Sequence, residues 1–231
     1  MQHLLLLHGA LGSKDQLTPL TESLKDKYIV HTLNFSGHGG RDFLSPVFSI
    51  ELFAGDVLDY LHEKNIAAVN IFGYSMGGYV AMWLAKHHAD KIKKVVTLAT
   101  KFYWDETVAA KEIKMLNAET IQQKVPAFAK QLQERHFPND WKEVLNRTKG
   151  LLLSLGQHNS LQLPDYSGIQ TSCLLLLGDK DKMITREETE EVHARLSHAQ
   201  FEILPDTPHP LEQVDVELLA SVVEFFLVRD N

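Results

Sequence analysis

Gly73-Tyr74-Ser75-Met76-Gly77 has the pattern G-x-S-x-G, and the residues on either side give that pattern its meaning. A β-type run, Ala68–Phe72, comes directly before it, and a run compatible with a helix starts at Gly78. A serine at such a strand-to-helix turn has strained backbone geometry and a hydroxyl exposed at the end of the strand. The amides of the following helix N-terminus favour developing negative charge beside that hydroxyl. The stretch therefore predicts a nucleophilic serine, with an incidental serine in a glycine-rich turn as the alternative.

Short apolar runs alternate with helical patterns along most of the chain. The expected strands are His3–Leu7, Tyr28–Asn34, Ala68–Phe72, Lys94–Ala99, Cys173–Leu177 and Gln200–Leu204. The expected helices are Leu17–Lys25, Ile50–Lys64, Gly78–His88, Arg186–Leu196 and Val214–Val228. Continuous apolar runs such as Leu4–Leu7 are typical of strands that are buried on both faces. The alternation predicts an α/β fold with a doubly wound, mainly parallel sheet of about six strands and helices on both sides.

One long stretch, residues 101–168, interrupts this alternation because it contains no good strand candidate. It holds three helical patterns instead, Glu106–Asn117, Glu119–His136 and Asn139–Gly156. Pro126 should kink or divide the second pattern, and Pro138 should end it. We expect a core made of residues 1–100 and 169–231, with residues 101–168 inserted as a helical cap over the carboxyl edge of the sheet.

The composition, with 44% hydrophobic and 23% charged residues, is that of an ordinary globular protein. A formal net charge of −7 and scattered basic residues argue against a nucleic-acid partner. No segment approaches the roughly 20 apolar residues of a membrane span, so no membrane partner is expected. Leu4–Leu7 is too short for a signal-peptide core and lacks a basic leader, so we expect a cytoplasmic protein.

Neither a cofactor nor a metal ion is expected. No two histidines pair at a zinc-like spacing with a third ligand. Cys173 is the only cysteine, which excludes an intrachain disulfide, and its apolar surroundings predict a buried, inert thiol.

Small or polar residues follow four of the expected strands at their carboxyl ends, where sheets of this kind bind ligands. They are the loop His8–Gly12, Ser75, the segment Gly178–Asp181 and the segment Asp206–His209. A serine hydroxyl becomes a good nucleophile when a histidine takes its proton, and that imidazole needs a carboxylate on its other nitrogen. The sequence therefore predicts Ser75 as nucleophile, His209 as base and an aspartate as the supporting acid.

Such chemistry forms an oxyanion, which preorganised backbone amides stabilise. The natural donors are the N–H of Met76, directly after the serine, and that of Ala10 or Leu11 in the first loop. We expect His8, in the same loop, to shape this loop rather than to react.

In these features the chain resembles the α/β-hydrolase family over nearly its whole length. The order Ser75, aspartate, His209 is the order of that family, as is a helical cap after the strand Lys94–Ala99. The family's acid commonly lies three residues beyond the glycine that ends its strand, which implies Asp181. Asp179, which could instead cap the loop backbone, and Asp105, where some members carry the acid, are the alternatives.

Three departures from the family pattern are visible. The family usually has two further strands before the strand that precedes the oxyanion loop. No such strands come before His3–Leu7 in this sequence, so a sheet of six strands is expected. His209 lies between Pro208 and Pro210, where a glycine commonly precedes the histidine, and Asn34 stands where an aspartate is frequent. None of these departures removes a residue of the expected triad.

The resemblance implies a serine hydrolase that cleaves a small-molecule acyl substrate, an ester, thioester or lactone, through an acyl-enzyme. A carbon–carbon bond hydrolase or lyase-like member of the family is one alternative, and a non-catalytic small-ligand binding module is another. The substrate-pocket candidates are His8, Tyr74, Phe102, Tyr103, Trp104 and Trp141. The last four are equally suited to packing the cap on the sheet.

The family topology also places Tyr28–Asn34 at the edge of the sheet, beside His3–Leu7. Charged residues precede this strand and polar ones interrupt it, which is typical of an edge protected against pairing with another chain. We therefore expect a monomer, with a dimer as the alternative.

Overall fold

Parallel strands form the centre of the protein. The computed structural model describes residues 1–229, and within them the strands form one six-stranded sheet in the order β2-β1-β3-β4-β5-β6. The strands are β1 (Gln2–Leu7), β2 (Tyr28–Thr32), β3 (Val69–Tyr74), β4 (Ile92–Leu98), β5 (Ser172–Gly178) and β6 (Ala199–Leu204). Each strand pairs with its neighbours in parallel. The predicted α/β fold class with a doubly wound parallel sheet is confirmed.

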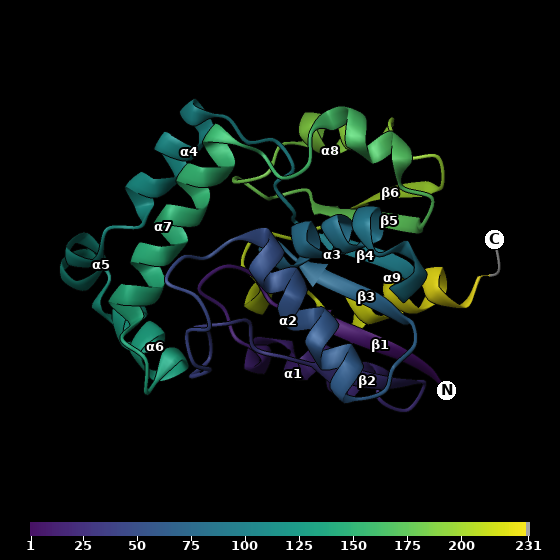
Figure 1. The fold of residues 1–231 in the computed structure, drawn as a ribbon, viewed down its shortest axis with the longest axis horizontal. Coiled ribbons are helices and arrows are strands. Elements are labelled where there is room, and N and C mark those ends of the chain that lie inside the picture. The colour runs from purple at the N-terminus through teal and green to yellow at the C-terminus, as the bar shows by residue number, and fades with distance from the viewer. Residues whose placement is uncertain (230–231) are drawn as a thin grey trace.

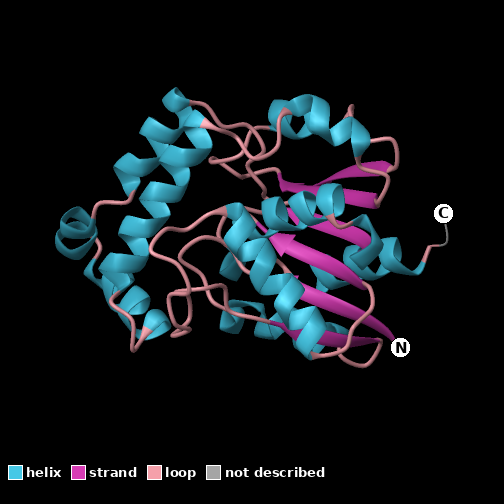
Figure 2. Cartoon of the chain, viewed as in Figure 1, coloured by secondary structure: helices cyan, strands magenta, loops and turns pink. Residues whose placement is uncertain are grey.

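Helices cover both faces of this sheet (Figures 1 and 2). They are α1 (Thr18–Leu24), α2 (Ile50–Glu63), α3 (Met76–His87), α8 (Arg186–His193) and α9 (Val216–Val228). Successive side chains of a strand point to opposite faces, so Leu5 and Leu7 pack in the hydrophobic cluster under α2 and α3. Leu4 and Leu6 pack in a second cluster, under α1 and α9. A continuous apolar strand is needed because both faces are buried.

Polar caps decide where several of these helices begin. The Ser49 hydroxyl accepts a hydrogen bond from the Leu52 amide at 3.0 Å ahead of α2.

The predicted elements occur at the expected places, with differences at their ends. Helix α3 begins at Met76 rather than at Gly78, because the turn before it is tight, and α8 ends at His193 rather than at Leu196. Short 3-10 turns occur at Lys14–Leu17, Ala89–Lys91, Ile113–Met115, Leu163–Gly168 and Leu211–Gln213.

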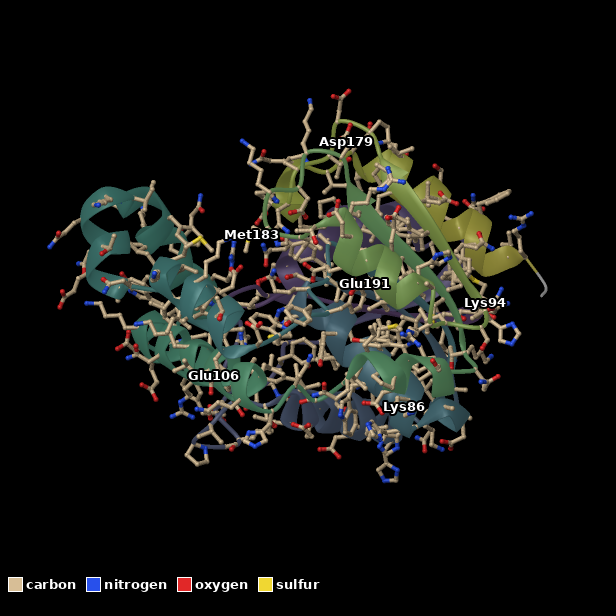
Figure 3. All side chains as sticks on the ribbon, turned by 90° about the horizontal axis from the view of Figure 1, so that it is seen from above. Lys86, Lys94, Glu106, Asp179, Met183 and Glu191 are labelled. Atoms are coloured by element: carbon tan, nitrogen blue, oxygen red, sulfur yellow. The ribbon has the colours of Figure 1, made fainter. Side chains whose placement is uncertain are left out.

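Four further helices, which we call the cap helices, follow β4 and precede β5. They are α4 (Glu106–Glu112), α5 (Ala118–Lys124), α6 (Pro126–His136) and α7 (Trp141–Gln157). Pro126 stands at the first position of α6 and divides the predicted pattern there, as expected. The cap helices lie beyond the carboxyl ends of the strands (Figure 1), and from above they project to the side opposite Lys94 (Figure 3).

Strand β2 lies at the edge of the sheet, where it pairs only with β1 among the described strands. Its predicted edge position is confirmed. His31 of this strand is partly buried, with its Nε2 at 2.9 Å from Nδ1 of His3 and its Nδ1 at 3.1 Å from the Tyr60 hydroxyl of α2. Polar side chains therefore occupy the outer part of the sheet beside this edge.

Cys173 of β5 is fully buried, and burial raises the pKa of its thiol to about 12.

In the part of the chain that the structure describes, no helix has the length and apolarity to cross a membrane. The last two residues of the expected core segment, 230 and 231, lie outside the described residues.

Two helical glycines provide a test of how closely the helices approach the sheet. A Cβ atom at Gly77 of α3 would lie 2.6 Å from the carbonyl oxygens of Leu7 and His8, whereas one at Gly150 of α7 would meet nothing within 4 Å. Gly77→Ala should therefore lower the free energy of unfolding by about 1–3 kcal/mol or more, as overpacking does. Gly150→Ala, the matched control, should raise it by about 0.5–1 kcal/mol. Urea unfolding measures both, and equal effects of the two substitutions would contradict the close contact.

Candidate active site

Ser75 lies at the turn between β3 and α3 with a backbone conformation that non-glycine residues rarely adopt. Its φ is 51° and its ψ is −118°. The turn is held from both sides, because the Ser75 amide donates to the Leu98 carbonyl at 2.8 Å and the Thr100 hydroxyl donates to the Ser75 carbonyl at 3.1 Å. Strain of this kind persists only where the surroundings enforce it, and it is common at functional sites. Met76 is the first residue of α3, so its amide has no hydrogen-bond partner within the helix.

His209 and Asp181 come together from the loops that follow β6 and β5. Nδ1 of His209 lies 2.7 Å from Oδ2 of Asp181, whose side chain is buried. The other oxygen, Oδ1, accepts the amides of Met183 at 2.8 Å and Ile184 at 3.0 Å. Burial alone would raise the pKa of the Asp181 carboxyl, but these three hydrogen bonds lower it below its ordinary value. An ionised carboxylate only accepts, so the neutral imidazole carries its proton on Nδ1 and leaves Nε2 free to take another.

The two alternative aspartates bind elsewhere. Asp179 accepts the Thr207 amide at 3.0 Å, a bond that lowers its pKa. Asp105 caps α4 by accepting the Val108 amide at 2.7 Å, and it also accepts the Tyr103 hydroxyl at 2.9 Å. Of the three candidates, only Asp181 hydrogen-bonds to the His209 ring.

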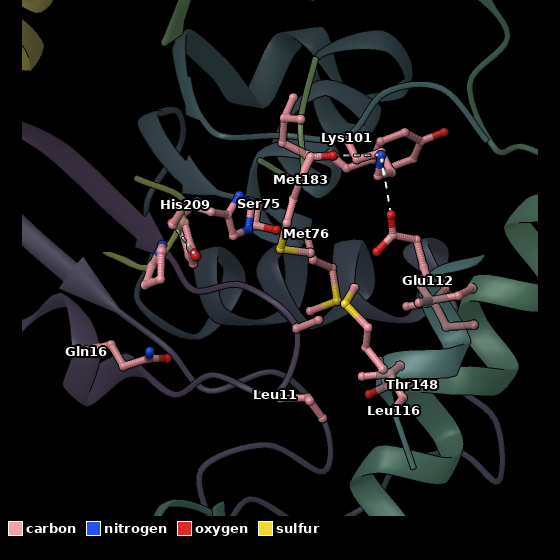
Figure 4. Close-up of a pocket in the computed structure, with 18 of the residues that line it drawn as sticks. Leu11, Gln16, Ser75, Met76, Lys101, Glu112, Leu116, Thr148, Met183 and His209 are labelled. Carbon is pink, nitrogen blue, oxygen red and sulfur yellow. Dashed lines mark hydrogen bonds and ion pairs between the residues drawn. The ribbon is translucent and has the colours of Figure 1, made fainter. Parts of the chain in front are cut away.

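Ser75 and His209 line the same cavity, which has a volume of about 660 Å³. Figure 4 shows the Ser75 hydroxyl and the His209 imidazole directed toward each other in its wall. Met76, Ala10 and Leu11, whose backbone amides are the candidate oxyanion donors, also line the cavity. The stretch from α4 to α7 contributes apolar lining residues, Leu116, Phe128, Leu151, Leu152 and Leu155, together with the polar Glu112, Gln131, Arg135 and Thr148.

The pocket candidates from the sequence divide into two groups. Tyr74 and Trp104 line the cavity. His8, Phe102, Tyr103 and Trp141 do not. His8 is fully buried at the start of the loop after β1, Phe102 packs edge-on against Tyr166 with 5.8 Å between ring centroids, and Trp141, the first residue of α7, is buried in the hydrophobic core. Tyr103 is exposed and directs its hydroxyl to Asp105.

Several charged residues line the cavity that sequence reasoning did not identify. Nζ of Lys101 lies 3.7 Å from Oε1 of Glu112 in α4 and donates to the Met183 carbonyl at 3.1 Å (Figure 4). Arg135 of α6 donates to the Leu11 carbonyl at 3.0 Å and lies 3.4 Å from Glu212. No local pattern distinguishes these residues from surface charges, since their partners lie far away in the sequence.

Three histidines near the loop after β1, His8, His38 and His136, are fully buried. The His38 ring lies 5.3 Å from that of His8 and 5.7 Å from that of His136, between centroids. Burial lowers the pKa of His8 to about 3 and that of His136 to about 4, and it lowers the pKa of His38 well below its ordinary value. They form no metal site, because no group of three or more histidine, cysteine, aspartate or glutamate side chains within residues 1–229 is arranged to hold a metal ion.

Comparisons with known proteins identify the family and the fold of this chain. Residues 2–168 match the family described as the alpha/beta hydrolase fold. The chain is 21% identical to the (E)-2-((N-methylformamido)methylene)succinate hydrolase of Acinetobacter baylyi. The alignment covers 97% of this chain and 89% of that protein. The pimeloyl-[acyl-carrier protein] methyl ester esterase of Neisseria meningitidis is 25% identical, with coverages of 96% and 92%. The crystal structure of the enol-lactonase from Burkholderia xenovorans superposes with a TM-score of 0.79 at 21% identity, over 99% of this chain and 92% of that one, a likeness of fold.

The three buried histidines predict a loss of stability in mild acid. In the unfolded chain each imidazole takes up a proton near its ordinary pKa of 6.5, whereas the folded protein resists protonation of His136 down to about 4 and of His8 down to about 3. The unfolded state therefore binds more protons in this window, and the free energy of unfolding should fall as the pH drops from about 6.5 toward 4. Each such histidine contributes a slope of at most about 1.4 kcal/mol per pH unit.

Urea unfolding at several pH values measures this slope. His38→Asn retains a side-chain donor for the Ser36 carbonyl, which His38 Nδ1 now binds, but removes one titrating group. Its slope between pH 6.5 and 4 should be shallower than that of the unchanged protein. Identical slopes would show that His38 titrates normally in the folded protein.

Proposed function

The chain belongs to the alpha/beta hydrolase fold family, and on that premise we propose that it is a serine hydrolase that cleaves a small carboxylic ester, thioester or lactone. The observation that carries the proposal is the Asp181–His209 hydrogen bond at 2.7 Å, beside a strained Ser75 in one cavity. These residue types at the carboxyl ends of three strands supply a nucleophile, a base and an acid.

In the proposed reaction, Nε2 of His209 takes the proton of Ser75 while the serine oxygen attacks the carbonyl carbon of the substrate. The Asp181 carboxylate holds Nδ1–H and stabilises the imidazolium that forms. The imidazolium then gives its proton to the leaving alcohol or thiol, and an acyl-enzyme on Ser75 remains. A water molecule, deprotonated by His209, releases the acid and restores the serine.

The tetrahedral oxyanion would be bound by backbone amides. The Met76 N–H, at the first position of α3, adds the positive end of the helix dipole to its hydrogen bond. The N–H of Ala10 or Leu11, in the loop after β1, is the proposed second donor. Leu11 has a φ of 57°, so this loop, like the Ser75 turn, is held in a conformation that non-glycine residues rarely adopt.

The cavity supports a small acyl substrate with a hydrocarbon part. Its volume of about 660 Å³ lies within the usual range of small-molecule sites, roughly 300–1,000 Å³. Residues 101–168 would act as a cap on a core of residues 1–100 and 169–231, because leucines of α7 line the same cavity as Ser75. Two relatives, named as a methyl ester esterase and an enol-lactonase, support ester-type bonds as the substrate class.

Replacing the nucleophile tests the proposal. Ser75→Ala should lower the turnover of an ester that the unchanged protein cleaves by about 10³–10⁶-fold, because only substrate binding and the oxyanion donors remain. The assay is a panel of short and medium acyl esters, thioesters and lactones, with circular dichroism to confirm that the variant folds. A fluorophosphonate probe should label Ser75 in the unchanged protein and nothing in the variant. A non-catalytic binding module would not be labelled at all, and a variant with a tenth of the original rate would end the proposal.

Replacing each aspartate in turn tests the identity of the acid. Asp181→Asn removes the charge that supports the imidazolium, and we expect kcat to fall by about 10⁴-fold, the cost known for such a change in a serine triad. Asp179→Asn and Asp105→Asn are the matched controls, since these carboxylates bind the backbone amides of Thr207 and Val108 and not the His209 ring. We expect them to change kcat by less than about tenfold, in keeping with loss of an N-cap or loop hydrogen bond rather than of the acid. A crippled Asp105→Asn variant beside an active Asp181→Asn variant would assign the acid to the end of β4.

A further inference from the structure

The cap helix α6 ends against the loop that follows β1. Two consecutive residues in its last turn donate to one carbonyl in that loop, the carbonyl of Leu11. Nη1 of Arg135 lies 3.0 Å from this oxygen, and Nε2 of His136 lies 3.1 Å from it. Both residues of α6 lie more than a hundred positions along the chain from Leu11.

The hydrogen bonds of His136 determine which of its nitrogens carries the proton. The Gly39 amide donates to Nδ1 at 3.1 Å, so this nitrogen is an acceptor and bears no proton. Nε2 therefore carries the proton and donates it to the Leu11 carbonyl. The side chain is fully buried, and burial favours the neutral imidazole that this arrangement needs.

The other end of the loop is held in a similar way. Nε2 of His8 accepts the Phe35 amide at 3.2 Å, so its Nδ1 carries the proton and donates to the Gly9 carbonyl at 2.8 Å. The Gly9 carbonyl also accepts the Gly12 amide at 3.1 Å. The loop is thus fixed at the carbonyls of Gly9 and Leu11, and the amides of Ala10 and Leu11 lie between these two points.

We propose that His136 is a positioning residue that orients the oxyanion-binding amides of the loop after β1 through its hydrogen bond to the Leu11 carbonyl. The inference rests on the proposed function, because it assigns that loop to the oxyanion. A rotation of Leu11 away from its φ of 57° would turn its carbonyl relative to its own N–H. Holding the carbonyl therefore limits the directions that the amides can take, and a misdirected donor stabilises the transition state poorly.

His136 is better suited to this role than Arg135. Arg135 lines the cavity and pairs with Glu212, so its substitution would change the substrate pocket as well as the loop. His136 does not line the cavity and has no exposed surface, so it reaches the substrate only through the loop. The alternative is a purely structural role, in which His136 supports the turn at Gly39 through Nδ1.

Two substitutions separate these roles, because each keeps one of the two hydrogen bonds. His136→Gln places an amide nitrogen near the position of Nε2 and retains a donor for the Leu11 carbonyl. His136→Asn places an amide oxygen near the position of Nδ1 and retains an acceptor for the Gly39 amide. We expect the Asn variant to lose kcat by about tenfold or more with little change in KM, since loss of an oxyanion donor outright costs about 10²–10³-fold. The Gln variant should recover most of that kcat.

The kinetics use an ester that the unchanged protein cleaves, and Ser75→Ala is assayed with the same ester. A folded Asn variant with unchanged kcat, or equal losses in both variants, would overturn the positioning role while leaving the proposed function intact. Turnover that persists in Ser75→Ala would instead contradict the proposed function.

Nuclear magnetic resonance tests the inference without any substrate. In the unchanged protein the nitrogen shifts of the His136 ring should show a protonated Nε2 and a bare Nδ1 at neutral pH. The opposite tautomer would overturn the inference. In the variants, the amide signals of Ala10 and Leu11 should move with Asn and stay near their original positions with Gln. Unmoved signals in the Asn variant would also overturn it.

Discussion

The close approach of α3 to β1 is the constraint on which the arrangement at Ser75 depends. No side chain fits between Gly77 and the carbonyl oxygens of Leu7 and His8, so helix and strand meet backbone to backbone. A longer turn between β3 and α3 would push the helix away from the sheet, and Ser75 therefore takes a positive φ of 51°. That conformation costs on the order of 1–3 kcal/mol, which the burial of both faces of the sheet offsets. The same contact brings the loop after β1 beside Ser75, where the proposed oxyanion donors are needed.

The cap helices are attached to the rest of the protein by polar contacts at both of their ends. Lys101, after β4, pairs with Glu112 of α4, and the end of α6 binds the Leu11 carbonyl. Helices α4 and α6 lie near opposite ends of α7 (Figure 1), and leucines of α7 line the cavity. Hydrophobic surface thus supplies the space for a substrate, while buried hydrogen bonds and an ion pair fix where that surface sits. Directional contacts suit this purpose, because apolar packing alone tolerates sliding.

Most of the fold could be predicted from the sequence because its signals are local. Apolar runs, helical periodicity and the prolines of the cap depend on near neighbours, and the chain order of Ser75, Asp181 and His209 follows from the order of the strands. Which of Asp179 and Asp181 binds His209 could be read only from the structure, because both follow the same strand and their side chains bind different partners. Phe102 and Trp141 were pocket candidates because aromatic residues suit both a core and a pocket, and their burial places them in the core. His136 had no local signal, since its partners at Leu11 and Gly39 are remote in the chain.

The single thiol of the chain has a practical consequence. Cys173 lies inside β5 without exposed surface, and a pKa near 12 leaves almost none of it as the reactive thiolate at neutral pH. The folded protein should therefore not react with maleimides or other thiol reagents. A cysteine introduced at an exposed position of the cap, such as Lys130, would be the sole labelling site. One fluorophore or spin label there would report cap movement without first removing a native cysteine, and the appearance of a second labelled site would mark unfolding of the sheet.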